Sequence, residues 1–387
     1  MTRWILYDHL TWPEVAALPR HCPLVLPLGK GYDREQLAEA LSFPEQIAIL
    51  PAFPFGWRSS GIPVPEGVLK EVLWNLLNSL RDDGFSNVFL LTPSGLNLNL
   101  GNAQLVQAYQ AAKEFDYSVE YLSKVVLIPI GHTEQHAYHL PLSTDTLIID
   151  AITAGVVSAI PHQACRLPVM PYGVSTHRSE FAGTLNAGGR AFEDFWLAVL
   201  DTLVLYGFNR FYLLSGHGGN CSFLTNIVKY AGERYPHIFC ATAYLYLTSP
   251  KGMQVLEQYR QSGIGGMGHA CELETSLMLY LHPELVHMDR VVDETDFIAT
   301  PSYYMDWVEG GSLIANPPWT DDTLSGAYGA GSFATQEKGK IWFEAAVQEK
   351  VAHVAEIHEQ YQRRCEKRKA NYSRFQQTAR IIHKEKG

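Results

Sequence analysis

The sequence predicts an α/β fold in which helices form layers around a mostly parallel sheet. Short apolar runs rich in Leu and β-branched residues alternate with longer stretches of helical spacing, and this alternation occurs twice along the chain. Gly, His and acidic residues follow several of the apolar runs. In open sheets of this class ligands bind at the carboxyl ends of the strands, so these residues are the candidates for a site.

The composition is that of a soluble globular chain large enough for two domains, with 387 residues of which 47% are hydrophobic and 18% charged. The sequence contains no uninterrupted apolar stretch of the roughly 18 residues that a membrane helix needs, and its start lacks the apolar core of a signal peptide. We therefore expect a cytoplasmic protein with no membrane partner. Six cysteines lie scattered without paired spacing, so any metal site is expected to use His and carboxylate.

Charge is distributed unevenly along the chain. Residues 363 to 387 hold nine Lys and Arg against two Glu, although the net charge of the whole chain is −10. The acidic body is unsuited to phosphate, so we expect no nucleic acid as the main partner. The basic tail is interpreted as a solvated helical extension, with docking on an acidic neighbour or an RNA as the alternative.

Three segments recur in the same order, which indicates a duplicated unit. LVLPLG (24–29) is similar to VLIPIG (126–131), ILPAFPFGW (49–57) to RLPVMPYGV (166–174), and DDGFSNVFLLTPSGLN (82–97) to LYGFNRFYLLSGHGGN (205–220). Helices are predicted between the strands of each copy, over 68–80 and 192–205. The first copy is shorter just after its first strand, where the second copy has acidic residues and histidines.

The first of these polar clusters follows the apolar run 125–130 of the second copy. In the next segment, GHTEQHAYHLPLSTDT (131–146), Glu134 and His136 point to the same side if the backbone is extended. Asp145 is expected to return to the same point from the following loop.

Two further clusters follow in the second copy. His217 ends the strand predicted over 211–214, and its small neighbours Gly218 and Gly219 allow a substrate to approach closely. The segment GHACELETSLML (268–279) supplies, at the start of an apolar helix, His269, Glu272 and Glu274. For Glu272 we prefer the reading of an acidic residue in the first turn of a helix.

Carboxylates mixed with imidazoles, without thiolates, are ligands for Zn²⁺, Mn²⁺ or Fe²⁺. A central aspartate can bridge two such ions about 3.5 to 4 Å apart, the arrangement that activates a water between them. The sequence therefore predicts two divalent metal ions in the second copy.

Four blocks of the sequence resemble the signature blocks of the creatininase family of metal-dependent amidohydrolases, in the same order. They are LIPIGHTEQHAYHLPLSTDT, YGVSTHRSEFAGTLN, YLLSGHGGN and HACELETSLMLYLHPELV. The resemblance covers about residues 120–350 and implies a creatininase-like layered fold.

The resemblance implies a two-metal amidohydrolase that uses a metal-bridging hydroxide to cleave a C–N amide bond. On the matching positions Glu134 and His217 would hold one ion and His136 the other. Asp145 would bridge the two ions. His269 would be the catalytic group that moves a proton to the leaving nitrogen, or else a histidine that only caps a helix.

The chain departs from creatininase proper in two places. Creatininase has a glutamate two residues after the loop histidine, where this chain has Gly219, and Glu274 is our candidate for that fifth ligand. Creatininase also has a substrate-covering tryptophan where this chain has 265–268, GGMG. Creatinine itself is therefore not the expected substrate, and a cyclic amide, a formamide or a peptide-like amide is. An alternative class is a non-catalytic, metal-containing binding or scaffold protein derived from the same fold.

Some residues near the expected site leave alternatives open. With Gly218 and Gly219, His177 is expected to bind substrate, and Arg178 either lines the same mouth or pairs with Glu180. The aromatic residues of one Pro/Gly-containing segment either form a lid or simply pack; they are Tyr303, Tyr304, Trp307 and Trp319. Three further residues are expected either to support the metal ligands from behind or to be purely structural: His132, His139 and Cys271.

We expect three parts: a degenerate repeat over 1–118, a catalytic domain over 119–350 and a basic helical extension over 351–387. Aligning the copies places Ser94 opposite His217, so the first copy lacks the metal ligands. The resemblance also implies a homo-oligomer, smaller than the family's hexamer because a fused repeat can take the place of a second subunit.

Overall fold

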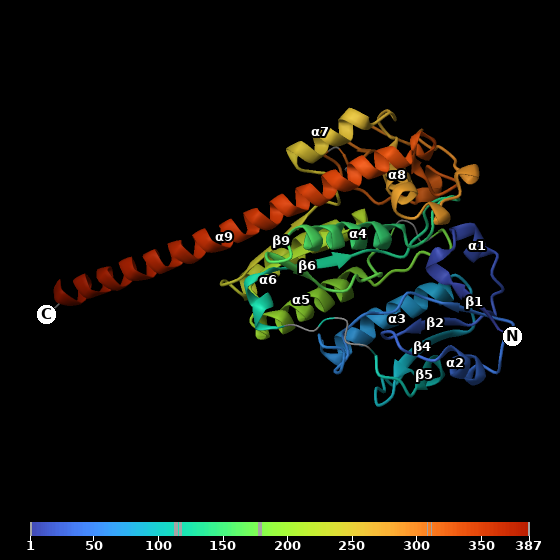
Figure 1. Cartoon of the computed structure of the whole chain (residues 1–387), viewed down its shortest axis with the longest axis horizontal. Coiled ribbons are helices and arrows are strands. Elements are labelled where there is room, and N and C mark those ends of the chain that lie inside the picture. Colours follow the sequence, from blue (N-terminus) through green and yellow to red (C-terminus); the bar gives the residue numbers. More distant parts are fainter. Residues whose placement is uncertain are drawn as a thin grey trace.

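Two parallel sheets, each accompanied by helices, form the body of the protein (Figure 1). The computed structural model describes residues 2–111, 115, 118–176, 180–307, 309, 310 and 312–385. The predicted class, an α/β fold layered around parallel sheets, is confirmed.

The second sheet along the chain carries the candidate site. Its order is β7-β6-β8-β9, with bounds β6 (Val125–Ile130), β7 (Ala164–Arg166), β8 (Arg210–Ser215) and β9 (Phe239–Ala243). The register pairs Val126 with Phe211 and Ile130 with Ser215. Because β6 and β8 end side by side, the segments that follow them emerge at the same edge.

The first sheet has the order β1-β3-β2-β4-β5. Its strands are β1 (Arg3–Leu6), β2 (Leu24–Pro27), β3 (Gln46–Ile49), β4 (Val88–Pro93) and β5 (Gln104–Gln107). Apart from β1, the order β3-β2-β4-β5 matches β7-β6-β8-β9 strand by strand along the chain. Duplication of one unit stays a prediction, and the shared strand order is what a duplication would produce.

Helices separate and cover the sheets. Their bounds are α1 (Trp12–Ala16), α2 (Arg34–Ala40), α3 (Glu66–Asp82), α4 (Thr144–Ala159), α5 (Gly189–Leu205), α6 (Cys221–Arg234), α7 (Pro250–Tyr259), α8 (Glu272–Leu281) and α9 (Gln336–Glu385). The helices predicted over 68–80 and 192–205 are confirmed as α3 and α5. These two helices lie between the sheets (Figure 1), where aromatic rings form much of the shared core: Phe53, Phe55, Phe195 and Trp196.

Short elements complete the chain, mostly between α7 and α9. The remaining strands are β10 (Met267–His269), β11 (Tyr304–Met305), β12 (Glu309–Gly310) and β13 (Tyr328–Gly329). The 3₁₀ turns are Tyr7–His9, Gly101–Ala103, Val119–Ser123, Gly218–Asn220, Pro283–Leu285, Met288–Arg290, Trp319–Asp321 and Gly331–Phe333. β10 pairs with β13, which brings the end of the loop region back to the start of α8.

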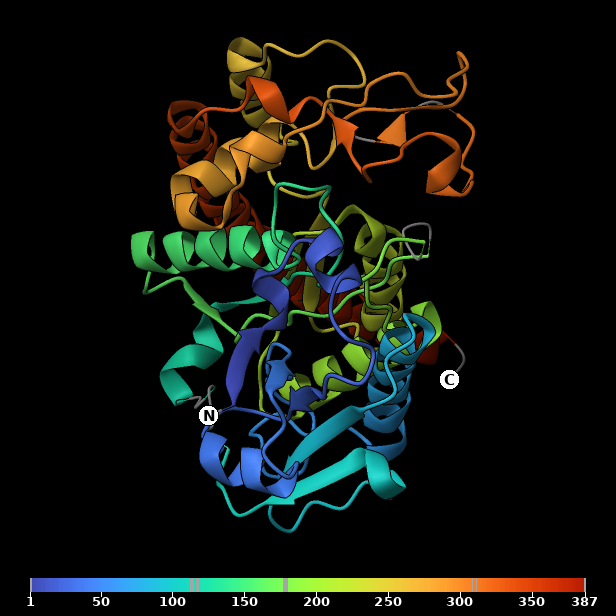
Figure 2. The ribbon, with the colours of Figure 1, turned by 90° about the vertical axis from the view of Figure 1, so that its right-hand side faces the viewer.

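The C-terminal helix α9 extends well beyond the body. It begins at Gln336, passes position 351 without a break and packs against α8, α4 and α7 before it projects away from the sheets (Figure 1). Figure 2 views the body from the side opposite to this projection. The expected helical extension is thus the outer part of a longer helix. Among the described residues, no helix combines the length and the apolar character needed to cross a membrane.

Two buried charged groups of α9 fasten this helix to the body, one through hydrogen bonds of Glu349 to the start of α7 and one through an ion pair of Lys338 with α8. Lys350 is fully buried with its Nζ 2.8 Å from Glu349 Oε1, and the Glu349 carboxylate also accepts the backbone N–H of Ser249 at the start of α7. Lys338 Nζ lies 2.6 Å from Glu272 Oε1 in the first turn of α8. A buried charge is tolerated only with such partners, so the contacts of Glu349 with Ser249 and of Lys338 with Glu272 fix where α9 sits.

We predict that Glu349→Ala destabilises the protein by roughly 3–5 kcal/mol, because Lys350 is left buried without its counter-charge. Urea unfolding measures the difference. The matched control is Glu344→Ala on the same helix, which removes an exposed pair with Lys340 and should change stability by less than about 0.5 kcal/mol. Equal effects of the two substitutions would contradict a structural role for the buried pair.

Candidate metal centre

The site begins where β6 and β8 end. Glu134 and His136 lie in the irregular segment that follows β6, and His217 follows β8. The prediction that Asp145 comes from a loop is wrong, since Asp145 lies in the first turn of α4. A Cβ on Gly216 would lie 2.2 Å from the Asp145 carbonyl oxygen, so the glycine allows this helix to start directly against the end of β8.

The two oxygens of the Asp145 carboxylate face two different imidazoles. Oδ1 lies 3.2 Å from His136 Nε2, and Oδ2 lies 3.3 Å from His217 Nδ1. Glu134 Oε1 is 2.9 Å from His217 Nδ1, and Glu274 Oε1 is 3.9 Å from His136 Nε2. All five side chains are buried. The structure therefore brings the five predicted ligands into one cluster with Asp145 at its centre.

Each inward-facing imidazole is oriented by a backbone carbonyl on its outer side. The pairs are His136 Nδ1 with Glu134 O at 3.1 Å, His217 Nε2 with Val174 O at 2.9 Å, and His269 Nε2 with Gln135 O at 2.7 Å. A carbonyl oxygen only accepts, so each neutral ring carries its proton on that outer nitrogen and its lone pair faces the carboxylates. This is how protein structures prepare histidine to bind a metal.

His132 is oriented the opposite way. The backbone N–H of Gly173 donates to its Nδ1 at 3.0 Å, so the neutral ring carries its proton on Nε2, 4.0 Å from Glu134 Oε2. Its ring also lies against that of His217, with 4.4 Å between centroids. His132 therefore presents an N–H toward Glu134 and positions that carboxylate, which agrees with the structural role expected for it.

Electrostatics within the cluster are dominated by the buried carboxylates. Burial disfavours a charged imidazole, but Asp145, Glu274 and Glu134 outweigh it and raise the pKa of His136 to about 9. Glu134 and Asp145 likewise overcome burial and raise the pKa of His217 to about 9. Burial also opposes the charge of Asp145, yet the two imidazoles hold the pKa of this carboxyl well below its usual range. Without another cation, protons on the imidazoles balance the carboxylates.

The donor set fits divalent metal ions. A cavity of about 20 Å³, lined among others by Glu134, Asp145, His217 and Glu274, lies at the cluster. His136, Asp145 and Glu274 offer ligand atoms within 4.8 Å of one another, and Glu134 and Asp145 both place a carboxylate oxygen within 3.3 Å of His217 Nδ1. Imidazole nitrogens and carboxylate oxygens without a thiolate suit Zn²⁺, Mn²⁺ or Fe²⁺.

Glu272 and Glu274 have the different environments that the sequence suggested, with Glu272 at a helix start and Glu274 near the cluster. Glu272 accepts the backbone N–H groups of Gln261 and Ser262 and pairs with Lys338, so it belongs to the scaffold. Glu274 turns toward His136 instead. The position that carries the glutamate in creatininase has no room for a side chain here, because a Cβ on Gly219 would lie 2.4 Å from His217 Nε2.

The expected proton carrier, His269, stands at the edge of the cluster. It ends β10, and its Nδ1 lies 3.7 Å from Glu134 Oε1. Its ring lies beside that of His136, with 4.2 Å between centroids, and meets the edge of Trp319 at 5.1 Å. His269 is therefore part of the same polar cluster, held between a metal-facing histidine and an aromatic wall.

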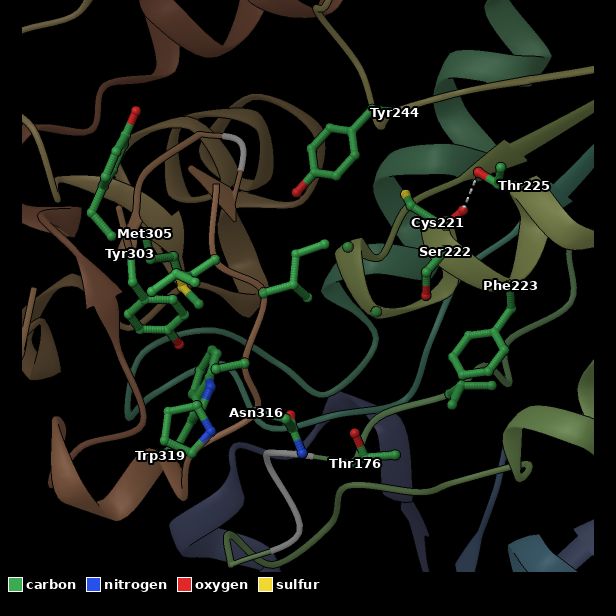
Figure 3. A pocket seen from close by; sticks show the side chains of 18 residues that line it. Thr176, Cys221, Ser222, Phe223, Thr225, Tyr244, Tyr303, Met305, Asn316 and Trp319 are labelled. Carbon is green, nitrogen blue, oxygen red and sulfur yellow. Dashed lines mark hydrogen bonds between the residues drawn. The ribbon is translucent and has the colours of Figure 1, made fainter. Parts of the chain in front are cut away.

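A larger cavity of about 540 Å³ adjoins the cluster, and Figure 3 shows the side chains that line it. Gly218 and Gly219 line it, as expected for substrate-binding residues, whereas His177 and Arg178 lie outside the described residues. The sequence left open whether the aromatic residues 303, 304, 307 and 319 cover the site or only pack, and the structure shows both situations. Tyr303, Tyr304 and Trp319 line the cavity, whereas Trp307 is buried and donates to the Leu247 carbonyl.

Sequence reasoning missed Tyr244, which lines both the small and the large cavity. It directly follows β9, so the rule that directed attention to the ends of β6 and β8 could have found it. The carbonyls of Val174 and Gln135 had no signal in the sequence, because any residue provides a backbone oxygen.

A parallel α/β fold with buried imidazoles and carboxylates at the carboxyl edge of its sheet is typical of enzymes that use divalent metal ions. More specifically, the chain belongs to the creatininase family, whose family model, described as creatinine amidohydrolase, matches residues 113–354. The resemblance seen in the sequence is thereby confirmed.

Individual relatives agree with this assignment. Creatinine amidohydrolase of Pseudomonas putida is 30% identical over 247 residues, which are 61% of this chain and 90% of the relative. Mycofactocin precursor peptide peptidase of Mycobacterium ulcerans is 30% identical over 179 residues, 43% of this chain and 62% of that protein. A solved structure described as creatininase with Mn has a TM-score of 0.51 and 26% identity, covering 60% of this chain and 91% of its own.

We expect the metal-free protein to lose stability as the pH rises from about 6.5 to about 9. The folded state raises the pKa of His136 and His217 above the 6.5 of an ordinary imidazole, so their stabilising charge is complete below pH 6.5 and lost through pH 9. Urea unfolding of chelator-treated protein should show a loss on the order of a few kcal/mol. Saturating Mn²⁺ should remove most of the dependence of stability on pH. A metal-free protein that is equally stable at pH 6.5 and pH 9 would contradict the prediction.

We predict that Gly219→Ala lowers metal content, because the added methyl group occupies the space of the bond between His217 Nε2 and Val174 O. Gly218→Ala is the matched control, since its Cβ would meet Tyr244 Oη at 3.4 Å, an ordinary contact. Metal per chain after dialysis against a weak chelator measures the difference. Equal retention by both variants would show that His217 does not need this orientation.

Proposed function

We propose that this protein is a two-metal amidohydrolase that cleaves a C–N amide bond in a small-molecule or peptide-like substrate. The observation that carries the proposal is the placement of Asp145, whose two oxygens face His136 and His217 separately. On each side of Asp145, one carboxylate oxygen faces a group made of one imidazole and one glutamate. A carboxylate in this position is suited to bridge two ions.

The residues divide between two ion positions. Glu134 and His217 would hold one ion, His136 and Glu274 the other, and Asp145 both. When bound, divalent ions polarise an amide carbonyl and lower the pKa of a coordinated water to about 7. Zn²⁺, Mn²⁺ and Fe²⁺ all suit these ligands, and a relative of known structure is described with Mn.

The chain itself supplies orientation and a proton carrier. The outer nitrogen of His269 donates to the Gln135 carbonyl, so Nδ1 is the atom that takes up and releases a proton. Its position beside the cluster and next to the larger cavity suits transfer to the leaving nitrogen of an amide. Gly218 and Gly219 keep the floor of the cavity free of side chains, which allows a carbonyl to approach the cluster.

Creatinine is not our proposed substrate. The stretch before His269 contains no tryptophan, and the cavity is large for such a small ring. A cyclic amide, a formamide or a peptide-like amide remains the proposed class, with activity in the catalytic part at 119–350. The degenerate repeat at 1–118, the extension at 351–387, the cytoplasmic location and a homo-oligomer smaller than a hexamer stay predictions.

Asp145→Asn should abolish both metal retention and hydrolysis while the fold is kept, because the isosteric amide fills the same space without the bridging charge. Plasma mass spectrometry should find about two ions per wild-type chain and fewer than one in the variant. Asp150→Asn is the matched control, since Asp150 lies on the same helix but pairs with Arg166. A wild-type protein that binds no Zn²⁺ or Mn²⁺ after reconstitution would reduce the cluster to a structural feature and overturn the proposed reaction.

A further inference from the structure

The larger cavity adjoins the metal cluster and is much too big for the scissile group alone. Gly218, Tyr244 and Met305 line both the 20 Å³ space at the cluster and the 540 Å³ cavity, so the two spaces share a wall. Cavities of roughly 300 to 1,000 Å³ hold ligands of drug size. The part of the substrate beyond the amide therefore has a volume of its own to occupy.

The described side chains that line this cavity carry no formal charge. Its polar groups are hydroxyls and an amide, which can donate or accept a hydrogen bond: Thr176, Ser222, Thr225 and Asn316. Figure 3 shows these side chains around the opening, with the rings of Tyr303 and Trp319 along another side. A neutral polar rim with an aromatic wall is suited to an uncharged, ring-bearing group.

Among the described residues, the charged side chains that line the adjoining small cavity already face a partner. Asp306, which lines the small cavity, receives both Arg260 guanidinium nitrogens, at 2.7 and 2.8 Å. The carboxylates of the cluster face imidazoles. A charged substituent placed in the larger cavity would lose hydration without gaining a counter-ion from the described residues that line it, which costs free energy.

The aromatic wall is held in place by its own packing. Trp319 is buried, lies 4.3 Å from the ring of Tyr328 and meets the ring of His269 edge-on. A planar group stacked along this wall would therefore lie next to the proposed proton carrier. The geometry couples recognition of the ring to placement of the amide.

We propose that the enzyme selects amides whose portion beyond the scissile bond is uncharged, contains a planar ring and is larger than creatinine. This inference rests on the proposed function for the amide chemistry, and on the cavity alone for the selectivity. The cavity is proposed to distinguish substrates by the charge of the group that lies at its rim, and not by their hydrophobicity alone.

The test uses three N-formylbenzylamines that differ at the para position: hydroxymethyl, carboxylate or aminomethyl. With the metal-loaded full-length enzyme, kcat/KM should be at least about tenfold higher for the neutral compound than for either charged one, a difference of roughly 1.4 kcal/mol. Thr225→Glu adds a negative charge at an exposed rim position and should shift the preference toward the aminomethyl compound by a similar factor.

Gly232→Glu is the matched control, because it adds the same charge to the same helix α6 at an exposed position with open space around it and outside the cavity. It should leave the wild-type preference unchanged. If wild type hydrolyses all three compounds equally, or if the two variants behave alike, the inference is overturned and the proposed function stands.

Isothermal titration of the Asp145→Asn variant with the same compounds distinguishes failure of the proposed selectivity from failure of the proposed reaction. Preferential binding of the neutral compound, shifted by adding Thr225→Glu, supports the inference even if the wild-type enzyme hydrolyses none of the three formamides, and in that case only formamides leave the proposed substrate class. Equal or undetectable binding of all three compounds overturns the inference.

Discussion

Repulsion between buried carboxylates is the constraint on which the rest of the site depends. Glu134, Asp145 and Glu274 converge in a place from which water is largely excluded, where three negative charges cannot persist without compensation. Imidazoles supply that compensation with protons, and divalent cations can supply it more strongly. The backbone carbonyls behind the histidines matter for this reason, because they decide which ring nitrogen faces the negative charge.

The architecture meets this constraint by bringing distant segments together at one sheet edge. β6 and β8 end in register, α4 starts against the end of β8, and α8 packs against α4. Each contributes one or two of the cluster residues, and each is anchored outside the cluster. Glu272 and Lys338 illustrate this, since their buried ion pair holds the start of α8 so that Glu274, two residues on, faces inward.

Local patterns in the sequence predicted most of the fold and the ligand set, because strand ends and helix periodicity leave a direct record in residue order. The helices at 68–80 and 192–205 and the grouping of Glu134, His136 and His217 follow from such patterns. The sequence predicts a loop at Asp145, whereas the structure places it in the first turn of α4, because Thr and Asp are common both in turns and at helix starts. The contribution of Tyr244 and the division of roles among the aromatic residues depend on tertiary packing, which spacing along the chain does not encode.

The continuous helix α9 gives the protein a mechanical connection between its projecting tip and its centre. At about 1.5 Å per residue, the 50 residues from Gln336 to Glu385 form a rod roughly 75 Å long. Near its base the rod packs along α8 and is pinned to that helix by the pair of Lys338 with Glu272. Because α8 also carries Glu274, a partner that holds the projecting end of α9 would hold a helix in direct contact with one that forms part of the cluster.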